Sequence, residues 1–153
     1  MRNMMVWAAV LSALVVPPAH AARLSCASQG SVRAQDSLMA YYSWPVIYRV
    51  YRTYERCDEN AFFSQAFSTA VIKTLIKKWD SISELQKFAG ADSTFLDFVL
   101  MHIDATAEYE DIKQILASTS KNSPKKCEKL CARLHARTAR AAAQIEQMLE
   151  EQR

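Results

Sequence analysis

The chain has 153 residues, a formal net charge of +3, and 50% hydrophobic against 23% charged residues. This balance is typical of one globular domain and excludes a disordered chain. Only two glycines are present, which excludes a glycine-rich phosphate loop, a dinucleotide-binding fingerprint and a turn-rich β-sandwich. The small total charge also argues against general nucleic-acid binding.

Residues 1–21 have the order that is typical of a signal peptide. Arg2 is the only charged residue, an apolar run covers residues 4–16, and the small-x-small triplet Ala19-His20-Ala21 follows. The apolar run is shorter than the ~20 residues that a bilayer-spanning helix needs. We therefore expect cleavage after Ala21, no membrane span in the mature protein, and a periplasmic or secreted location. Residues 22–153 are predicted to form a single helical domain.

The first part of the mature chain is predicted to be only partly helical. Residues 22–35 are expected to be irregular, and a short helical piece over residues 36–42 precedes a helix that begins near Ser43. Pro45 fits the first turn of that helix, where a missing N–H costs little. Apolar residues at spacings of three and four place Cys57 on its buried face.

Four further helices are predicted between this helix and the last one. Their expected N-terminal caps, or first residues, are Asp58 or Asn60, Ser81, Asp92 or Ser93, and Thr106. The sequence Ser81-Ile-Ser-Glu84 matches a capping box, and Gly90 is expected to end that short helix. The polar residues 117–123 form the clearest predicted loop.

The last helix is predicted to begin at Ser123-Pro124, a cap followed by a proline. Its apolar positions follow a heptad seam: Cys127, Cys131, Leu134, Thr138, Ala141, Ile145 and Met148. The middle of the seam is weak because it holds threonine and alanine. We expect residues 139–153 to project from the body, to fray, or to form a homodimer with a second copy of the chain.

The four cysteines are Cys26, Cys57, Cys127 and Cys131, and an even number in an exported protein predicts two disulfides. Cys127 and Cys131 lie four residues apart on one predicted helix, where a bond between them would distort the backbone. We therefore expect each to bond with Cys26 or Cys57, in either combination. Such a bond closes a loop of about 70–100 residues and stabilises the fold by ~4 kcal/mol. Four thiolates on zinc are the alternative, but the usual C-x2-C spacing is missing.

The pattern as a whole predicts an all-α fold. We expect a compact bundle of about five to six helices with a long C-terminal helix, cross-linked by disulfides.

Charge is segregated along the chain. Residues 121–140 carry seven basic residues against one acidic residue, whereas residues 58–111 carry ten acidic residues and four lysines. The basic stripe, with Arg133 and Arg137 among its members, could dock an acidic partner or an anionic wall polymer. The alternative is a solvated helix face that pairs with the acidic middle of the same molecule.

Aromatic residues cluster early in the chain, and Arg52 lies among them. Tyr48 and Tyr51 share a helix face with Trp44, and tyrosine and arginine are enriched at binding hot spots. We therefore name Tyr48, Tyr51, Arg52, Arg133 and Arg137 as candidate partner-binding residues. The alternative for the tyrosines is core packing with hydroxyls that reach solvent.

Enzyme chemistry finds little support in the sequence. His102 lies on an apolar helix and is expected to be a hydrogen-bonded core or rim residue. Asp97, His102 and Asp104 could form a metal or acid–base set, but helical spacing points them in different directions. No catalytic residues, metal ligands or cofactors are predicted.

The runs YRTYERCD at residues 51–58 and SQAFSTAVIKTLIKKWDSISEL at residues 64–85 are similar to small exported proteins of Gram-negative bacteria. At the level of architecture, the chain resembles the periplasmic immunity proteins that neutralise type VI secretion peptidoglycan amidases. Those proteins are also small, helical, signal-bearing and disulfide-linked.

We therefore expect a periplasmic binding protein that acts by protein–protein interaction, as an inhibitor or immunity protein. Its partner would be another protein, such as a secreted toxin or a wall enzyme, and not a nucleic acid. The first alternative is a periplasmic chaperone or stress protein that uses the C-terminal seam, and the second is a wall-associated enzyme.

Overall fold

The computed structural model describes residues 26–121, 124 and 127–153, so the predicted signal peptide and the cap Ser123 lie outside the described residues. The described part contains helices and no strand, which confirms the all-α class and the long C-terminal helix. Its elements are α1 (Gln29–Ala40), α2 (Trp44–Tyr54), η1 (Glu55–Cys57), α3 (Ala61–Lys77), η2 (Trp79–Ser81), α4 (Ile82–Ala91), α5 (Ser93–Met101), α6 (Tyr109–Lys121) and α7 (Glu128–Glu151).

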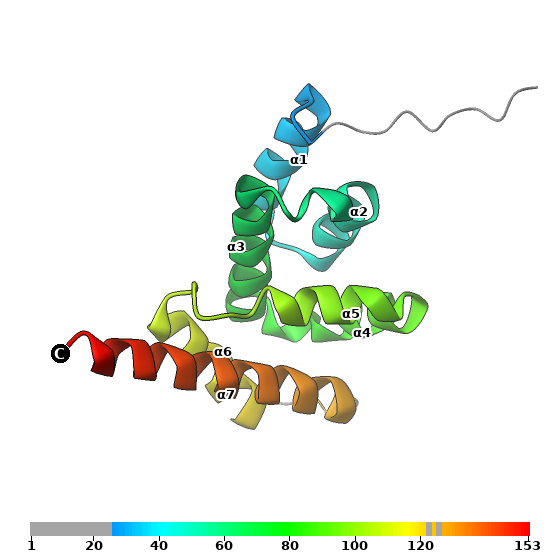
Figure 1. The fold of residues 1–153 in the computed structure, drawn as a ribbon. Helices are drawn as coiled ribbons and strands as arrows, with labels where there is room; N and C mark the ends of the chain where they lie inside the picture. The colour runs from blue at the N-terminus through cyan, green and yellow to red at the C-terminus, as the bar shows by residue number, and fades with distance from the viewer. Residues whose placement is uncertain (1–25, 122–123, 125–126) are drawn as a thin grey trace, which may run out of the picture.

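Helix α3 lies at the centre of the bundle and packs against α1, α2 and α6 (Figure 1). Its residues Phe63, Phe67, Val71 and Leu75 recur every four positions and are at most 1% exposed. Each such side chain contributes roughly 1.5–3 kcal/mol when it leaves water. The predicted apolar face of this helix is therefore the main contribution to the core.

Two of the predicted helix caps are confirmed. The Asn60 side chain accepts a bond from the Phe62 N–H at 3.1 Å, and Asp92 Oδ1 accepts from the Thr94 N–H at 3.2 Å. Ser81 differs, because its hydroxyl donates back to the Lys78 carbonyl at 2.7 Å and the expected capping box does not form.

The prediction that residues 22–35 are irregular is wrong from Gln29 onward. Ser28 caps α1, because its hydroxyl accepts a bond from the Ser31 N–H at 3.2 Å. Ser31, Ala34 and Leu38 are buried on one face of α1. Such a small apolar face gives a weak periodic signal, so the sequence pattern did not reveal this helix.

The predicted loop at residues 117–123 is also wrong for its first part, because α6 continues to Lys121. Ser120 donates its hydroxyl to the Leu116 carbonyl at 2.9 Å. Serine and threonine lose their preference for loops when their hydroxyls bond to the preceding turn of a helix. Polar composition alone therefore placed the end of this helix too early.

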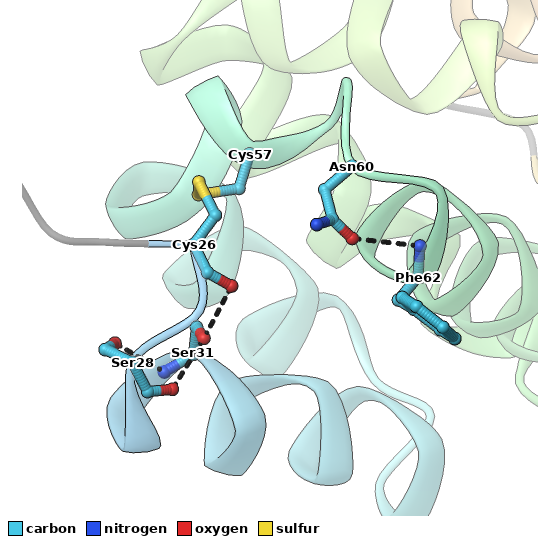
Figure 2. The surroundings of a disulfide bond; sticks show 6 residues. All are labelled: Cys26, Ser28, Ser31, Cys57, Asn60 and Phe62. Atoms are coloured by element: carbon cyan, nitrogen blue, oxygen red, sulfur yellow. Dashed lines mark hydrogen bonds between the residues drawn. A yellow bond between two sulfur atoms is a disulfide. The ribbon is translucent and has the colours of Figure 1, made fainter.

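The disulfide pairing differs from the expected one. Cys26 bonds to Cys57 (Figure 2), and Cys127 bonds to Cys131 with 5.3 Å between their Cα atoms. We expected Cys127 inside a helix that begins at Ser123-Pro124. Instead Cys127 is the N-cap of α7, so its side chain is not held by a preceding helical turn. Two cysteines at this separation are within the range that a disulfide spans.

Helix α7 is held to the body by its seam, not by a disulfide to the front of the chain. Leu134, Thr138, Ala141 and Ile145 are buried, largely against α6, whereas Met148 is 42% exposed. Because Ile145 is buried while Met148 and Leu149 are exposed, the expected projection of residues 139–153 is limited to the last part of α7, at the red end of the ribbon in Figure 1.

The two disulfides should contribute unequally to stability. Their sequence separations are 31 and 4 residues, and the longer loop loses more conformational entropy when it is closed. The Cys26→Ser/Cys57→Ser variant should lower the free energy of unfolding by about 3–4 kcal/mol, and Cys127→Ser/Cys131→Ser by about 2 kcal/mol. Urea denaturation measures both values.

Tryptic mapping without reduction checks the pairing itself. Trypsin cuts after Lys126, Lys129 and Arg133, so the pairing requires Cys-Glu-Lys and Leu-Cys-Ala-Arg to appear as one linked species. A peptide that joins Cys57 to Cys127 or Cys131 would contradict it.

Candidate functional site

A groove of about 330 Å³ lies between α1 and α2. One wall comes from α1 and the other from α2, with Tyr41 from the connection between them. Its lining residues are Gly30, Arg33, Ala34, Ser37, Tyr41, Val46, Arg49, Val50, Thr53 and Tyr54. These residues recur at spacings of three and four on both helices, so each wall is a single helix face.

The two helices approach closely at one end of this groove. A Cβ atom added at Gly30 would lie 2.9 Å from the Tyr54 hydroxyl, which is too close for an unstrained contact. Glycine is therefore the residue that lets the first turn of α1 meet the end of α2. At the other end, residues 41–43 connect the helices directly.

The charge of the groove is positive. Arg33 and Arg49 are exposed, and neither forms an ion pair with a carboxylate of the described residues. The lining contains no acidic residue. An apolar floor between two arginines that remain available suits a segment with carboxylates beside apolar side chains.

The Cys26–Cys57 disulfide (Figure 2) links the two helices at the end of the groove where the start of α1 meets the end of α2. Cys26 precedes α1, and Cys57 ends η1, which directly follows α2. The Ser31 hydroxyl donates to the Cys26 carbonyl at 2.8 Å and thereby ties the first turn of α1 to the same point. Both walls are thus joined before any ligand binds.

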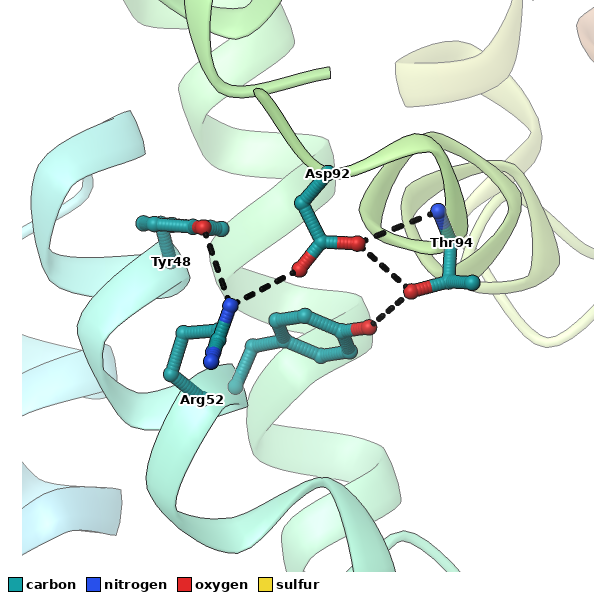
Figure 3. A network of polar contacts seen from close by, with 5 residues as sticks. Tyr48, Arg52, Asp92 and Thr94 are labelled. Atoms are coloured by element: carbon teal, nitrogen blue, oxygen red, sulfur yellow. Dashed lines mark hydrogen bonds and ion pairs between the residues drawn. The ribbon is translucent and has the colours of Figure 1, made fainter. Parts of the chain in front are cut away.

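The predicted residues Tyr48, Tyr51 and Arg52 belong to a network between α2 and the α4–α5 junction (Figure 3). The Tyr51 hydroxyl lies 2.7 Å from Thr94 Oγ1, and Arg52 reaches Asp92 at 3.3 Å. Tyr51 is only 4% exposed, and burial raises the pKa of its hydroxyl. The bonds from Thr94 lower the pKa of Asp92 and hold its carboxylate charged.

Tyr48 is half-buried and stacks on Phe88 with ring centroids 4.6 Å apart. Of these three residues, Arg52 alone is mostly exposed, at 60% of its side chain. The network therefore mainly attaches α2 to α4 and α5, with Arg52 at its solvent-facing edge.

The side chains of Arg133 and Arg137 also bond to other groups of the same chain. Arg133 pairs with Asp97 at 2.5 Å on the surface. Arg137 Nε donates to the carbonyls of Leu100 at 2.9 Å and Ile103 at 2.7 Å. Leu100 lies in the last turn of α5 and Ile103 follows the helix, so the Arg137 cation adds bonds to carbonyls at and just after the C-terminus of α5, where the helix dipole favours positive charge.

A larger groove of about 560 Å³ lies between α3 and the connection from α5 to α6. Its charged side chains are largely used within the protein. Lys73 bonds to Asp111 at 2.7 Å, and Asp104 accepts from the Thr106 N–H at 2.8 Å. In the α1–α2 groove, by contrast, Arg33 and Arg49 form no ion pair with any other described residue.

His102 is a core residue, as expected, and is 2% exposed. Its Nδ1 lies 2.9 Å from Ser68 Oγ, and its Nε2 lies 3.3 Å from Asp58 Oδ1 without hydrogen-bond alignment. Burial lowers the pKa of His102, although Asp58 and Asp104 oppose that shift. A neutral imidazole beside a serine could accept its proton. However, Ser68 lies inside α3, where the helix already uses the backbone N–H groups that would stabilise an oxyanion.

The other acidic members of the predicted set do not join His102 in these contacts. Asp97 binds Arg133, and Asp104 binds Thr106. Across residues 26–121 and 127–153, no group of three or more His, Cys, Asp and Glu side chains is arranged to hold a metal ion. Within the same residues, no helix has the length and hydropathy that a bilayer crossing requires.

No protein-family model, curated protein or solved structure matches this chain. Function must therefore be inferred from the residues and geometry of the chain itself. The sequence pointed to the aromatic and arginine residues of α2 but not to Arg33, which fell in the segment predicted to be irregular. Its spacing of three from Gly30 and four from Ser37 is the signal that could have placed it on a helix face.

Arg137 should matter more for stability than Arg133. Hydrogen bonds from a charged donor are worth ~1.5–3 kcal/mol, whereas an exposed ion pair contributes roughly 0–1 kcal/mol. We expect Arg137→Ala to lower the free energy of unfolding by about 2 kcal/mol, and Arg133→Ala by less than about 1 kcal/mol. Chemical denaturation of the two variants makes the comparison, and equal losses would show that the carbonyl contacts of Arg137 are unimportant.

Acid should destabilise the fold through His102. Because its pKa is below the ordinary value of 6.5, the folded protein binds this proton less well than the unfolded chain. The stabilisation is present above that ordinary value and is lost as the pH falls through the lowered pKa. Thermal melts from about pH 7 to about pH 5 should show this loss, and His102→Gln should reduce it.

His135→Gln, at an exposed position, is the matched control for the loss of a histidine. Asp58→Asn removes a carboxylate that favours the charged imidazole, so it should increase the loss of stability in acid. A His102→Gln variant with the pH dependence of the wild type would show that another group is responsible.

Proposed function

We propose that the mature protein is a periplasmic binding protein that acts on another protein by occupying part of its surface, as an inhibitor or immunity protein. The α1–α2 groove is its binding site. The partner contributes a segment that carries carboxylates next to an apolar side chain. A secreted toxin or an enzyme of the cell wall is the class of partner that the exported location favours.

The observation that carries this proposal is the pair of available arginines over an apolar floor. Arg52, Arg133 and Arg137 all bond to groups of the chain itself, whereas Arg33 and Arg49 form no ion pair within the described residues. Arginine is enriched at the centres of protein interfaces because its planar group binds carboxylates at two points.

Pre-organisation of the groove supports the same function. The Cys26–Cys57 disulfide joins both walls, so binding costs little additional ordering of the chain. Disulfides persist in oxidising compartments, and residues 1–21 have the pattern of an export signal. Both features agree with a periplasmic site of action.

A photo-crosslinking amino acid at Tyr41, which is 67% exposed in the groove, should capture the partner in intact cells. The same amino acid at Arg140 on α7 is the control and should capture little. Mass spectrometry of the linked species identifies the partner for a binding measurement.

With that partner purified, Arg33→Glu/Arg49→Glu should weaken binding at least about 10-fold, because it places like charges against the partner's carboxylates. Lys129→Glu/Arg140→Glu makes the same change in net charge on α7 and should have a much smaller effect. If the α7 variant abolishes binding and the groove variant does not, the basic stripe is the interface and the proposed site is wrong.

A further inference from the structure

The end of α7 is an apolar surface that the fold leaves without cover. Met148 is 42% exposed and Leu149 is 45% exposed, although α7 remains helical to Glu151. At 100° per residue, both side chains lie within 60° of the buried Ile145. They therefore continue the seam that attaches α7 to the body.

The seam loses its cover because α6 is too short. Tyr109, the first residue of α6, donates its hydroxyl to Glu146 on α7. The two helices are antiparallel, so residues after Glu146 extend past the start of α6 (Figure 1). About 8 Å of helix follows Glu146, at a rise of ~1.5 Å per residue.

The charges at this end are complementary to those of the α1–α2 groove. Glu146, Glu150 and Glu151 are exposed around Met148 and Leu149. The groove presents Arg33 and Arg49 around an apolar floor. A short helix that lies in such a groove is a common mode of peptide recognition, in which one apolar face makes the contact.

We propose that the end of α7 from a second copy of this chain binds in the α1–α2 groove. Met148 and Leu149 of one copy pack on the groove floor of the other, and Glu150 and Glu151 of the first copy pair with Arg33 and Arg49 of the second. A pair of copies that exchange their α7 ends makes this contact twice. Self-association then covers the binding site of the proposed function and competes with the partner.

The proposal rests on the groove assigned above, but it is tested without any partner. Sedimentation analysis of the mature protein alone, up to about 1 mM, should show association that weakens with added salt. The concentration is high because small interfaces bind weakly. A wild-type protein that stays monomeric over this range would overturn the proposal, whatever the fate of the partner search.

Variants with reversed charge test whether the groove and the end of α7 are the two surfaces that meet. The groove variant Arg33→Glu/Arg49→Glu and the tail variant Glu150→Arg/Glu151→Arg should each be monomeric, because groove and tail then carry the same charge. A mixture of the two variants should associate again, since each groove meets a tail of opposite charge. All four positions are exposed, so circular dichroism should show intact helices.

Removal of the apolar contact gives an independent test. Met148→Ser/Leu149→Ser should abolish association in the wild-type background without a change in net charge. If association persists in this variant, or if the mixture of charge-reversed variants stays monomeric, the copies meet through another surface and the proposal is wrong.

Discussion

The Cys26–Cys57 disulfide is the constraint on which the front half of the molecule depends. Helix α1 buries only three residues on its inner face, one of them a serine, and so has little apolar area to hold it in place. The disulfide instead joins its start to the end of α2, and the Ser31 hydroxyl adds a bond to the same segment. Without this link, α1 would be held to the body only by its packing against α3 and α2.

The C-terminal half of the molecule is held together in a different way. Helix α7 has no disulfide to the rest of the chain, since Cys127 and Cys131 bond to each other at its start. Its attachment comes from the seam against α6 and from Arg137, which donates to one carbonyl in the last turn of α5 and to one just after that helix. The local disulfide can order the first turn of α7, but it cannot fix where the helix lies.

The sequence correctly predicted those features of the fold that depend on residues close together along the chain. The helical class, the apolar face of α3 and the caps Asn60 and Asp92 all follow from local patterns and were correct. The disulfide pairing failed because it depended on where α7 begins. The roles of Tyr51 and Arg137 were not predictable, since their bonding partners lie 34–43 residues away. The groove was hidden because one of its walls was predicted to be irregular.

The distribution of arginines connects stability with function. A guanidinium that satisfies helix carbonyls or a neighbouring carboxylate contributes to folding, and a partner could use it only by breaking those bonds. Arg137 and, more weakly, Arg52 and Arg133 are in this position. Among the described residues, no ion pair uses the guanidinium of Arg33 or Arg49, and both side chains flank the same apolar groove. In the proposed function, binding at Arg33 and Arg49 therefore breaks no bond of the described residues, whereas binding at Arg133 or Arg137 of α7 would.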